Sequence, residues 1–224
     1  MKDYLDIVYS RSDKPLTSYP EQLVDYILSQ VGIKKNSGLS LLEPGVGVGD
    51  HLRIFRKRGF VVRGLDVSER SKEMSPDLEI DVIDADVKRW PYEDCSFDVV
   101  YSKSFIEHLT DPELFLFEAF RVLRPGGIIV TLTPDWVANY KKFFDDYTHK
   151  SPFTKTSLRN IKVAAGFEDV NSFTFRQLPS TWHNPFLNQF CALIAIFVPY
   201  QTKFKFFRWS RELMLMGHGT KPNG

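Results

Sequence analysis

A glycine-rich stretch in the first quarter of the chain constrains its fold more than any other feature. Residues 43–49 read EPGVGVG, with glycine at every second position from Gly45 to Gly49. An apolar run over residues 39–42 precedes it, and residues 51–57 follow with helix-like spacing. A strand, a glycine-rich turn and a helix in this order are typical of a doubly wound α/β sheet, which binds nucleotides at the carboxyl end of its first strand. Glycine suits the turn because it adopts positive φ angles and lets a ligand approach where a Cβ atom would collide.

The composition is that of one globular domain. The chain has 224 residues, of which 25% are charged, and a net charge of +1, so the charge does not favour nucleic acid as a partner. Cys95 and Cys191 are too few for a disulfide framework, which predicts a reduced, cytoplasmic protein. The N-terminus carries acids where a signal peptide would be apolar, and no uncharged run reaches the about 18 residues of a spanning helix.

Further motifs follow the glycine-rich stretch in a consistent order. They are FDVV at residues 97–100, EHL at residues 107–109 and LRPGG at residues 123–127. Together with the E-x-G-x-G-x-G pattern at residues 43–49, they resemble the class I S-adenosylmethionine-dependent methyltransferases, in particular the methyltransferase type 11 and ubiquinone-biosynthesis-like family. The resemblance covers residues 39–177 well and the two ends poorly. It implies S-adenosylmethionine as the cofactor.

The fold that this resemblance implies is a Rossmann-like, doubly wound α/β domain, with a mostly parallel seven-stranded sheet and an antiparallel last strand. We expect a single methyltransferase domain over residues 1–224. Its parts are an N-terminal helical cap, a cofactor-binding core, an apolar and basic insertion and the last strand, at residues 1–38, 39–177, 178–210 and 211–218. An amphipathic helix that starts at Tyr19 would cover the sheet or close over the cofactor, and both remain open.

The first two strands are expected to supply most of the cofactor site. The resemblance assigns the glycine loop to the cofactor through Glu43, Gly45, Gly47 and Gly49. A second strand ends at Asp66, where a carboxylate accepts hydrogen bonds from ribose hydroxyls in nucleotide-binding α/β folds. The alternative for Asp66 is a cap of the following helix without a ligand, and the alternative for the whole loop is a glycine turn that binds nothing.

The third and fourth strands complete the expected cofactor site. The resemblance gives Asp86 the recognition of the adenine amino group, with Asp84 as the second candidate, and it gives the backbone N–H of Val87 the contact with the ring. The alternative is that these acids are solvated loop charges. Ser102, in the strand over residues 96–102, is the last residue that we assign to the cofactor.

Two histidines are the candidates for catalysis. Residues 134–153 are expected to lie over the carboxyl ends of the strands, where ligands bind in this fold. His149 in this segment suits a general base because its pKa lies near working pH, and His108 in the EHL motif is the second choice. The alternatives are a surface loop without chemistry and a structural histidine. We expect no metal site, because the acids are scattered and the histidines lack ligand spacing.

A second apolar region lies near the C-terminus. Residues 186–198 are very apolar, and residues 203–211 mix bases with aromatic side chains. One interpretation is an extra core or dimer helix with a solvated basic end. Another is peripheral contact of residues 185–209 with a membrane or a lipid-linked substrate. Stacking on single-stranded nucleic acid has weaker support on a neutral protein.

The predicted activity is transfer of a methyl group from S-adenosylmethionine to an acceptor. The acceptor is expected to be a small molecule, a sugar or a lipid-linked glycan, methylated on oxygen. Two other classes compete: an NAD(P)-dependent oxidoreductase that uses the same loop with Asp66, and a non-catalytic binding protein of the same fold. The LRPGG turn and the loop at Asp86 disfavour the oxidoreductase. The protein is expected to be a monomer or homodimer that does not bind nucleic acid.

Overall fold

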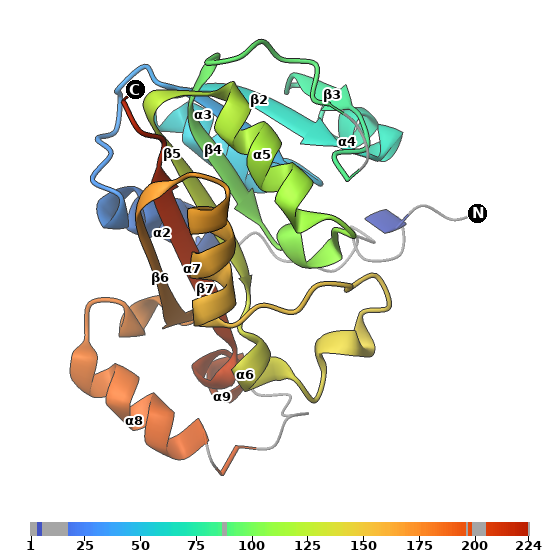
Figure 1. The fold of residues 1–224 in the computed structure, drawn as a ribbon. Coiled ribbons are helices and arrows are strands. Elements are labelled where there is room, and N and C mark those ends of the chain that lie inside the picture. The colour runs from blue at the N-terminus through green and yellow to red at the C-terminus, as the bar shows by residue number, and fades with distance from the viewer. Residues whose placement is uncertain (1–3, 6–17, 87–88, 196, 199–204, 224) are drawn as a thin grey trace.

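A seven-stranded sheet forms the centre of the molecule, in the strand order β3-β2-β1-β4-β5-β7-β6 (Figure 1). The computed structural model describes residues 4–5, 18–86, 89–195, 197–198 and 205–223. The neighbouring pairs among β1 to β5 are parallel, whereas β7 is antiparallel to β5 and to β6, so the predicted Rossmann-like sheet is confirmed. The strands are β1 Ser40–Pro44, β2 Val61–Asp66, β3 Ile80–Val82, β4 Phe97–Lys103, β5 Leu123–Pro134, β6 Glu168–Arg176 and β7 Leu213–Thr220.

Helices cover both faces of the sheet, because neighbouring residues of a strand point to opposite sides. Leu41 of β1 packs in an apolar cluster with α2 and α3, and Leu42 packs in a second cluster with α5 and α7. Figure 1 shows α5 and α7 in front of the sheet and α2 behind it. The α-helices are α2 Tyr19–Gln30, α3 Asp50–Lys57, α4 Glu69–Met74, α5 Pro112–Val122, α6 Trp136–Asn139, α7 Lys155–Ala164, α8 Pro185–Ala195 and α9 Lys205–Arg211.

The leading helix α2 covers the sheet. Its apolar stripe is fully buried in the cluster that contains Leu41 and consists of Leu23, Val24, Ile27 and Leu28. These positions share one side of a helix at a spacing of 3.6 residues per turn. Of the two roles that the sequence left open for this helix, the structure therefore shows the cover of the sheet.

Local signals place the starts of the two helices on the opposite face. Asp111 caps α5 by accepting a hydrogen bond from Leu114 N at 3.0 Å, and Pro112 occupies the first turn, where its missing N–H costs nothing. Thr154 begins α7 in a capping box, in which its hydroxyl accepts from Ser157 N and the Ser157 hydroxyl accepts from Thr154 N. Residues of the first turn therefore set the start of each helix.

Strand order and chain order diverge between β1 and β4. β1 and β4 are neighbours in the sheet although β2 and β3 separate them in the sequence. After β1 the chain passes to α3 on one face, and after β4 it passes to α5 on the other. The two connections therefore run to opposite faces of the sheet from the carboxyl ends of β1 and β4. Open α/β sheets bind their ligands at such a point.

The C-terminal insertion does not add a helix to the core. In α8, Phe186, Phe190 and Leu193 are exposed by 84%, 54% and 65%, and Cys191 is the buried residue of this helix. The prediction of an extra core helix is therefore wrong for the described part of residues 178–210. The physical reason is that α2, α3, α5 and α7 already cover the sheet, so its faces have no room for another apolar helix.

A buried lysine lies between α7 and the sheet. Lys162 has no exposed surface, and its Nζ donates a hydrogen bond to Thr131 Oγ1 of β5 at 2.6 Å. Burial disfavours the charged ammonium group and lowers the pKa of Lys162 from 10.5 to about 7. Between these two values the unfolded chain holds a proton that the folded chain has released, so stability must rise with pH there.

We predict that the free energy of unfolding rises more steeply with pH in the wild type than in Lys162→Met. Between the pKa values of the folded and the unfolded lysine, the slope of the wild type exceeds that of Lys162→Met by up to about 1.4 kcal/mol per pH unit. Below the pKa of the folded lysine, the two slopes are equal. Urea denaturation at several pH values measures the slopes. Lys155→Met, which removes an exposed lysine of the same helix, should retain the wild-type slope. Equal slopes for the wild type and Lys162→Met would contradict a buried, neutral lysine.

Candidate active site

The glycine loop between β1 and α3 has a backbone that side chains would not permit. Gly45, Gly47 and Gly49 have φ angles of +71°, +54° and +70°, which lie in the left-handed region. A Cβ atom on Gly45 would lie 2.3 Å from Cδ2 of Phe105, in the turn after β4. The loop is therefore packed directly against the β4 turn, at the carboxyl ends of β1 and β4.

Asp66 ties this loop to the end of β2. Its Oδ2 accepts a hydrogen bond from Gly47 N at 2.8 Å, and its Oδ1 accepts one from Ser68 N at 3.0 Å. The cap of α4 is Ser68, whose hydroxyl accepts from Arg70 N, so the alternative role of Asp66 as the helix cap is wrong. Both carboxylate oxygens of Asp66 therefore take part in joining the glycine loop to the end of β2.

Glu43 ends β1 as a buried acid that lacks a hydrogen-bond partner at one oxygen. The residue is 4% exposed, and its Oε2 makes no hydrogen bond with the described protein groups. Burial raises the pKa of Glu43 well above its usual value, and the charges of Asp50 and Asp66 act in the same sense, while Lys103 opposes them. A buried carboxyl group without partners is costly, and a bound cation or hydrogen-bond donor would relieve that cost.

Ser102 of β4 provides a second such atom. It is 1% exposed, and its Oγ lacks a partner among the described groups. Ser102 lies near the carboxyl end of β4, the strand next to β1, so it lies at the same edge of the sheet as the end of β1. S-adenosylmethionine carries an ammonium group, a sulfonium and ribose hydroxyls, and these fit the unpaired oxygen of Glu43 and the acceptors of Asp66. The residues present therefore suit this cofactor.

Asp86 holds the start of α5. Its two oxygens accept hydrogen bonds from Thr110 N and Asp111 N at 2.8 and 2.7 Å, and Asp84 Oδ1 accepts one from Asp86 N at 3.0 Å. Lys150 Nζ lies 3.6 Å from Asp86 Oδ2. The loop charges are thus ordered by the backbone rather than simply solvated. Recognition of adenine by Asp86 stays a prediction, and Val87, predicted to contact the ring, lies outside the described residues.

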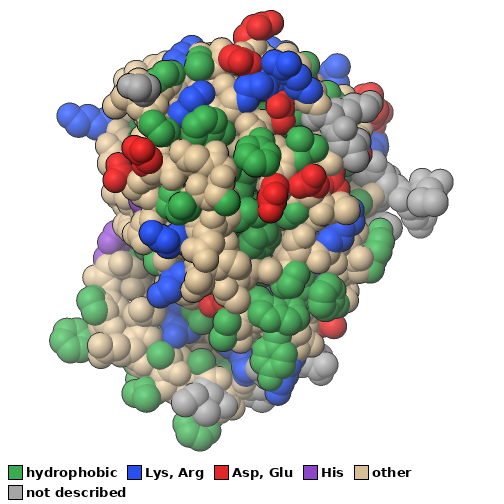
Figure 2. Space-filling view, in the orientation of Figure 1, with side chains coloured by type: hydrophobic (Ala, Val, Ile, Leu, Met, Phe, Trp, Pro, Cys, Tyr) green, Lys and Arg blue, Asp and Glu red, His purple; other side chains and the backbone are tan. Residues whose placement is uncertain are grey.

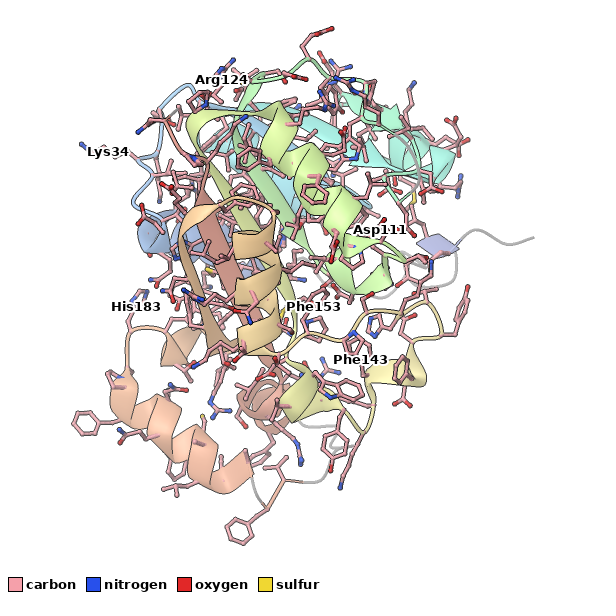
Figure 3. The ribbon with its side chains drawn as sticks, in the orientation of Figure 1. Lys34, Asp111, Arg124, Phe143, Phe153 and His183 are labelled. Atoms are coloured by element: carbon pink, nitrogen blue, oxygen red, sulfur yellow. The ribbon has the colours of Figure 1, made fainter. Side chains whose placement is uncertain are left out.

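The two candidate histidines meet in space. The ring centroids of His108 and His149 lie 4.7 Å apart. His149 Nδ1 is 2.6 Å from the carbonyl oxygen of Phe143, a residue labelled in Figure 3, and His108 Nδ1 is 2.8 Å from the hydroxyl of Thr148. Burial, with the neighbouring His149 as a second cause, lowers the pKa of His108 to about 4. His108 is therefore a neutral imidazole at neutral pH.

Glu107 is a site residue that the sequence analysis did not single out. It has no exposed surface, its Oε2 accepts a hydrogen bond from Thr133 Oγ1 at 3.0 Å, and its Oε1 has no partner among the described groups. Burial raises the pKa of Glu107 to about 7. Glu107 belongs to the EHL motif, but no spacing in the sequence indicates that it lies beside both histidines.

A cavity of about 220 Å³ opens beside the histidine pair and the ends of β4 and β5. His149 contributes to its wall, together with Lys103 at the end of β4. The remaining wall comes from the α6 segment, from the start of β7 and from Gln177 after β6. Its lining residues are Lys103, Ser104, Pro134, Asn139, Lys142, Phe143, His149, Gln177, Glu212, Leu213 and Met214. A small acceptor group could therefore reach His149 from the side of β4.

Comparison with known sequences identifies the central part of the chain. A family model described as a methyltransferase domain matches residues 42–131. A sarcosine/dimethylglycine N-methyltransferase from Halorhodospira halochloris is 32% identical over 57% of this chain and 48% of its own length. A 2-methyl-6-phytyl-1,4-hydroquinone methyltransferase from Synechocystis is 36% identical over 44% of this chain and 32% of its own length. The chain thus spans about half, or less, of the length of the curated relatives that it matches.

Solved structures share the whole fold. A S-adenosylmethionine-dependent methyltransferase from Archaeoglobus fulgidus superposes with a TM-score of 0.69 over 98% of this chain and all of its own, at 20% identity. A phosphoethanolamine N-methyltransferase from Haemonchus contortus, solved with S-adenosylhomocysteine, gives 0.61 over 89% of this chain and 52% of its own, at 20% identity. Residues 42–131 thus match a methyltransferase domain, the solved structures share the fold, and both agree with S-adenosylmethionine as the predicted cofactor.

We predict that Asp66→Ala weakens binding of S-adenosylmethionine by roughly 1.5–3 kcal/mol, the usual worth of hydrogen bonds to a charged group. Asp66→Asn should bind with intermediate affinity, because an amide oxygen can still accept from Gly47 N. Titration calorimetry measures both. Asp94→Ala, which removes an exposed acid paired with Arg89 and Arg121, is the matched control and should bind as the wild type does. Unchanged affinity of Asp66→Ala would refute the assignment.

Proposed function

We propose that this protein transfers a methyl group from S-adenosylmethionine to an oxygen atom of a small, sugar or lipid-linked acceptor. The observation that carries the proposal is the unpaired buried oxygen of Glu43 at the end of β1, beside a glycine loop, together with a cavity at the ends of β4 and β5 that His149 lines. The bound cofactor supplies an electrophilic methyl group. The protein holds the methyl group and the acceptor in line, and this positioning alone increases the reaction rate strongly.

The cofactor is held, in this proposal, by the carboxyl ends of β1, β2 and β4. Glu43 pairs with a cationic part of the ligand, the loop lets the ligand approach its backbone, and Asp66 accepts hydrogen bonds from the ribose. Asp86 reaches the adenine through its remaining acceptor sites. The complete set that we assign to the cofactor is Glu43, Gly45, Gly47, Gly49, Asp66, Asp86, Val87 and Ser102.

The acceptor occupies the cavity beside His149. An oxygen acceptor must lose its proton when it accepts a methyl group, and a neutral imidazole nitrogen can take that proton. The hydrogen bond from His149 Nδ1 to the Phe143 carbonyl oxygen leaves Nε2 as the atom with a free lone pair. His108, with its Nδ1 bonded to Thr148, is the second candidate for this role. The relatives are named for both nitrogen and ring acceptors, so oxygen is part of the proposal.

An apolar stripe suggests how a lipid-linked acceptor would be reached. The exposed side chains of Phe186, Phe190 and Leu193 are three or four residues apart, so they share one side of α8. Figure 2 shows hydrophobic side chains at the lower end of the molecule, where Figure 1 places α8. Within its described residues the chain has no helix long and apolar enough to cross a bilayer. We propose peripheral contact through residues 185–209, of which only a part is described.

The acceptor class and the role of His149 are tested together. Formation of S-adenosylhomocysteine is measured with matched panels of hydroxyl and amine acceptors, including sugars and lipid-linked glycans. We expect turnover with a hydroxyl acceptor, and a loss of about 10²–10⁴-fold in kcat for His149→Asn, with unchanged affinity for S-adenosylmethionine. His183→Asn, an exposed histidine outside the site, should have wild-type kcat. Turnover with amines alone would contradict methylation on oxygen.

Membrane contact is tested by sedimentation with vesicles that contain anionic lipid. The double variant Phe186→Ser, Phe190→Ser is expected to bind vesicles less than the wild type, because it removes apolar surface from α8. Phe117→Ser is the matched control, since Phe117 is an exposed phenylalanine of α5. If the double variant binds vesicles as the wild type does but changes from dimer to monomer in sedimentation velocity, the stripe is a dimer contact instead.

A further inference from the structure

Three potential metal ligands lie together at the wall of the cavity. One ligand atom from each of Glu107, His108 and His149 lies within 4.8 Å of the other two. The sequence spacing had predicted no metal site. The fold brings His149 to the β4 turn, because Lys150 N and Ser151 N both donate hydrogen bonds to the carbonyl oxygen of Glu107, at 2.8 and 2.9 Å.

Hydrogen bonds place a hydrogen on Nδ1 of both imidazoles, so that Nε2 is the nitrogen that can bind a metal. The Phe143 carbonyl oxygen can only accept, so His149 Nδ1 carries the hydrogen. Thr148 donates its hydroxyl hydrogen to Asp146 Oδ1 at 2.6 Å, so its oxygen accepts from His108 Nδ1. His108 therefore keeps a free lone pair on Nε2, and Nε2 is the nitrogen of His149 that the Phe143 carbonyl oxygen leaves unengaged. Histidine ligands commonly donate their other N–H to a carbonyl oxygen or a carboxylate-linked group, as these two do.

Glu107 gives an independent sign of a missing partner. The residue is completely buried, and while Thr133 satisfies its Oε2, its Oε1 has no hydrogen-bond partner among the described groups. Buried carboxyl oxygens in folded proteins are nearly always paired, so an unpaired one calls for a partner. The oxygen belongs to the same group of ligand atoms as the two imidazoles, and a bound cation would pair with it.

The surrounding charges are mixed. Asp146 Oδ2 lies 4.0 Å from His149 Nε2 and adds a second negative charge on the side of the loop. Lys103 lines the cavity, and its positive charge acts on Glu107, so it opposes a cation. The charge of Lys150 also acts on His108 and opposes a cation, whereas Lys142 in the cavity wall is paired with Glu212. Two imidazoles with one carboxylate are a donor set that divalent transition metals occupy with coordination positions left open.

We propose that Glu107, His108 and His149 bind one divalent transition-metal ion, with its open positions directed at the acceptor cavity. Its use toward an acceptor oxygen rests on the proposed methyl transfer. There the ion would coordinate the acceptor oxygen and lower its pKa, so that the proton leaves to solvent water while the oxygen takes the methyl group; His149 would then be a ligand, and it would be the base only in the metal-free protein. Binding of the ion itself does not depend on that function.

The test is metal binding to the whole, chelator-treated protein without S-adenosylmethionine or acceptor. Zn²⁺ is titrated by calorimetry, and Co²⁺ is titrated by its visible absorption, which reports nitrogen ligands. We expect one ion per chain. Loss of a residue that only holds a metal ligand in place weakens metal binding about 10–100-fold, and we expect Thr148→Val to fall within that range. Glu107→Gln and His149→Asn change a ligand itself, so each should weaken binding at least as much. His183→Asn, the exposed histidine, should bind as the wild type does.

The outcomes separate this proposal from the proposed function. Absence of saturable Zn²⁺ and Co²⁺ binding in the wild type would overturn the metal site, and so would wild-type affinity in both ligand variants. Glu107→Gln keeps the volume and the bond to Thr133, and circular dichroism of each variant identifies a folding defect. The titration contains no cofactor, so absence of metal binding would not contradict the proposed methyl transfer. If the protein binds the ion but not S-adenosylmethionine, the metal site stands and the proposed function does not.

Discussion

The hydrogen bond from Gly47 N to the Asp66 carboxylate is the interaction on which the rest of the site depends. It joins the loop after β1 to the end of β2, the two parts that we propose to contact the cofactor. The same loop packs against Phe105 at Gly45, which couples it to the turn after β4. That turn carries Glu107 and His108, and the backbone of Glu107 holds the segment that carries His149. Cofactor edge and acceptor cavity are thus parts of one connected structure.

Three of the buried polar atoms without a partner among the described groups lie at this edge of the sheet, whereas Ser71 Oγ, Trp90 Nε1 and Ser172 Oγ lie elsewhere. Glu43 Oε2, Ser102 Oγ and Glu107 Oε1 lack partners among the described groups, and they belong to the ends of β1 and β4 and to the turn that follows β4. Each costs stability in the free protein. Proteins depart from full polar satisfaction mostly at functional sites, so the gathering of such atoms at one edge supports a binding site there.

The sequence predicted the fold and the glycine turn after β1 well because both depend on short-range signals. Apolar periodicity, caps such as Asp111 and the glycine loop each act within a few residues. The exposed face of α8 was mispredicted, because apolar composition does not say whether a sheet face is still free. The meeting of Glu107 with His108 and His149 was missed for a similar reason: it depends on backbone bonds from residues 150 and 151, which no spacing in the sequence reveals.

Parallel calorimetric titrations of the purified protein with S-adenosylmethionine, S-adenosylhomocysteine and NADH test the central claim most directly. The carboxyl edge of β1, β2 and β4 presents an unpaired acid to a cationic ligand and a second acid to a ribose, so we expect the first two compounds to bind and NADH not to bind. Binding of NADH alone would contradict the account and favour an oxidoreductase. Binding of none of the three would show that this edge does not hold the cofactor.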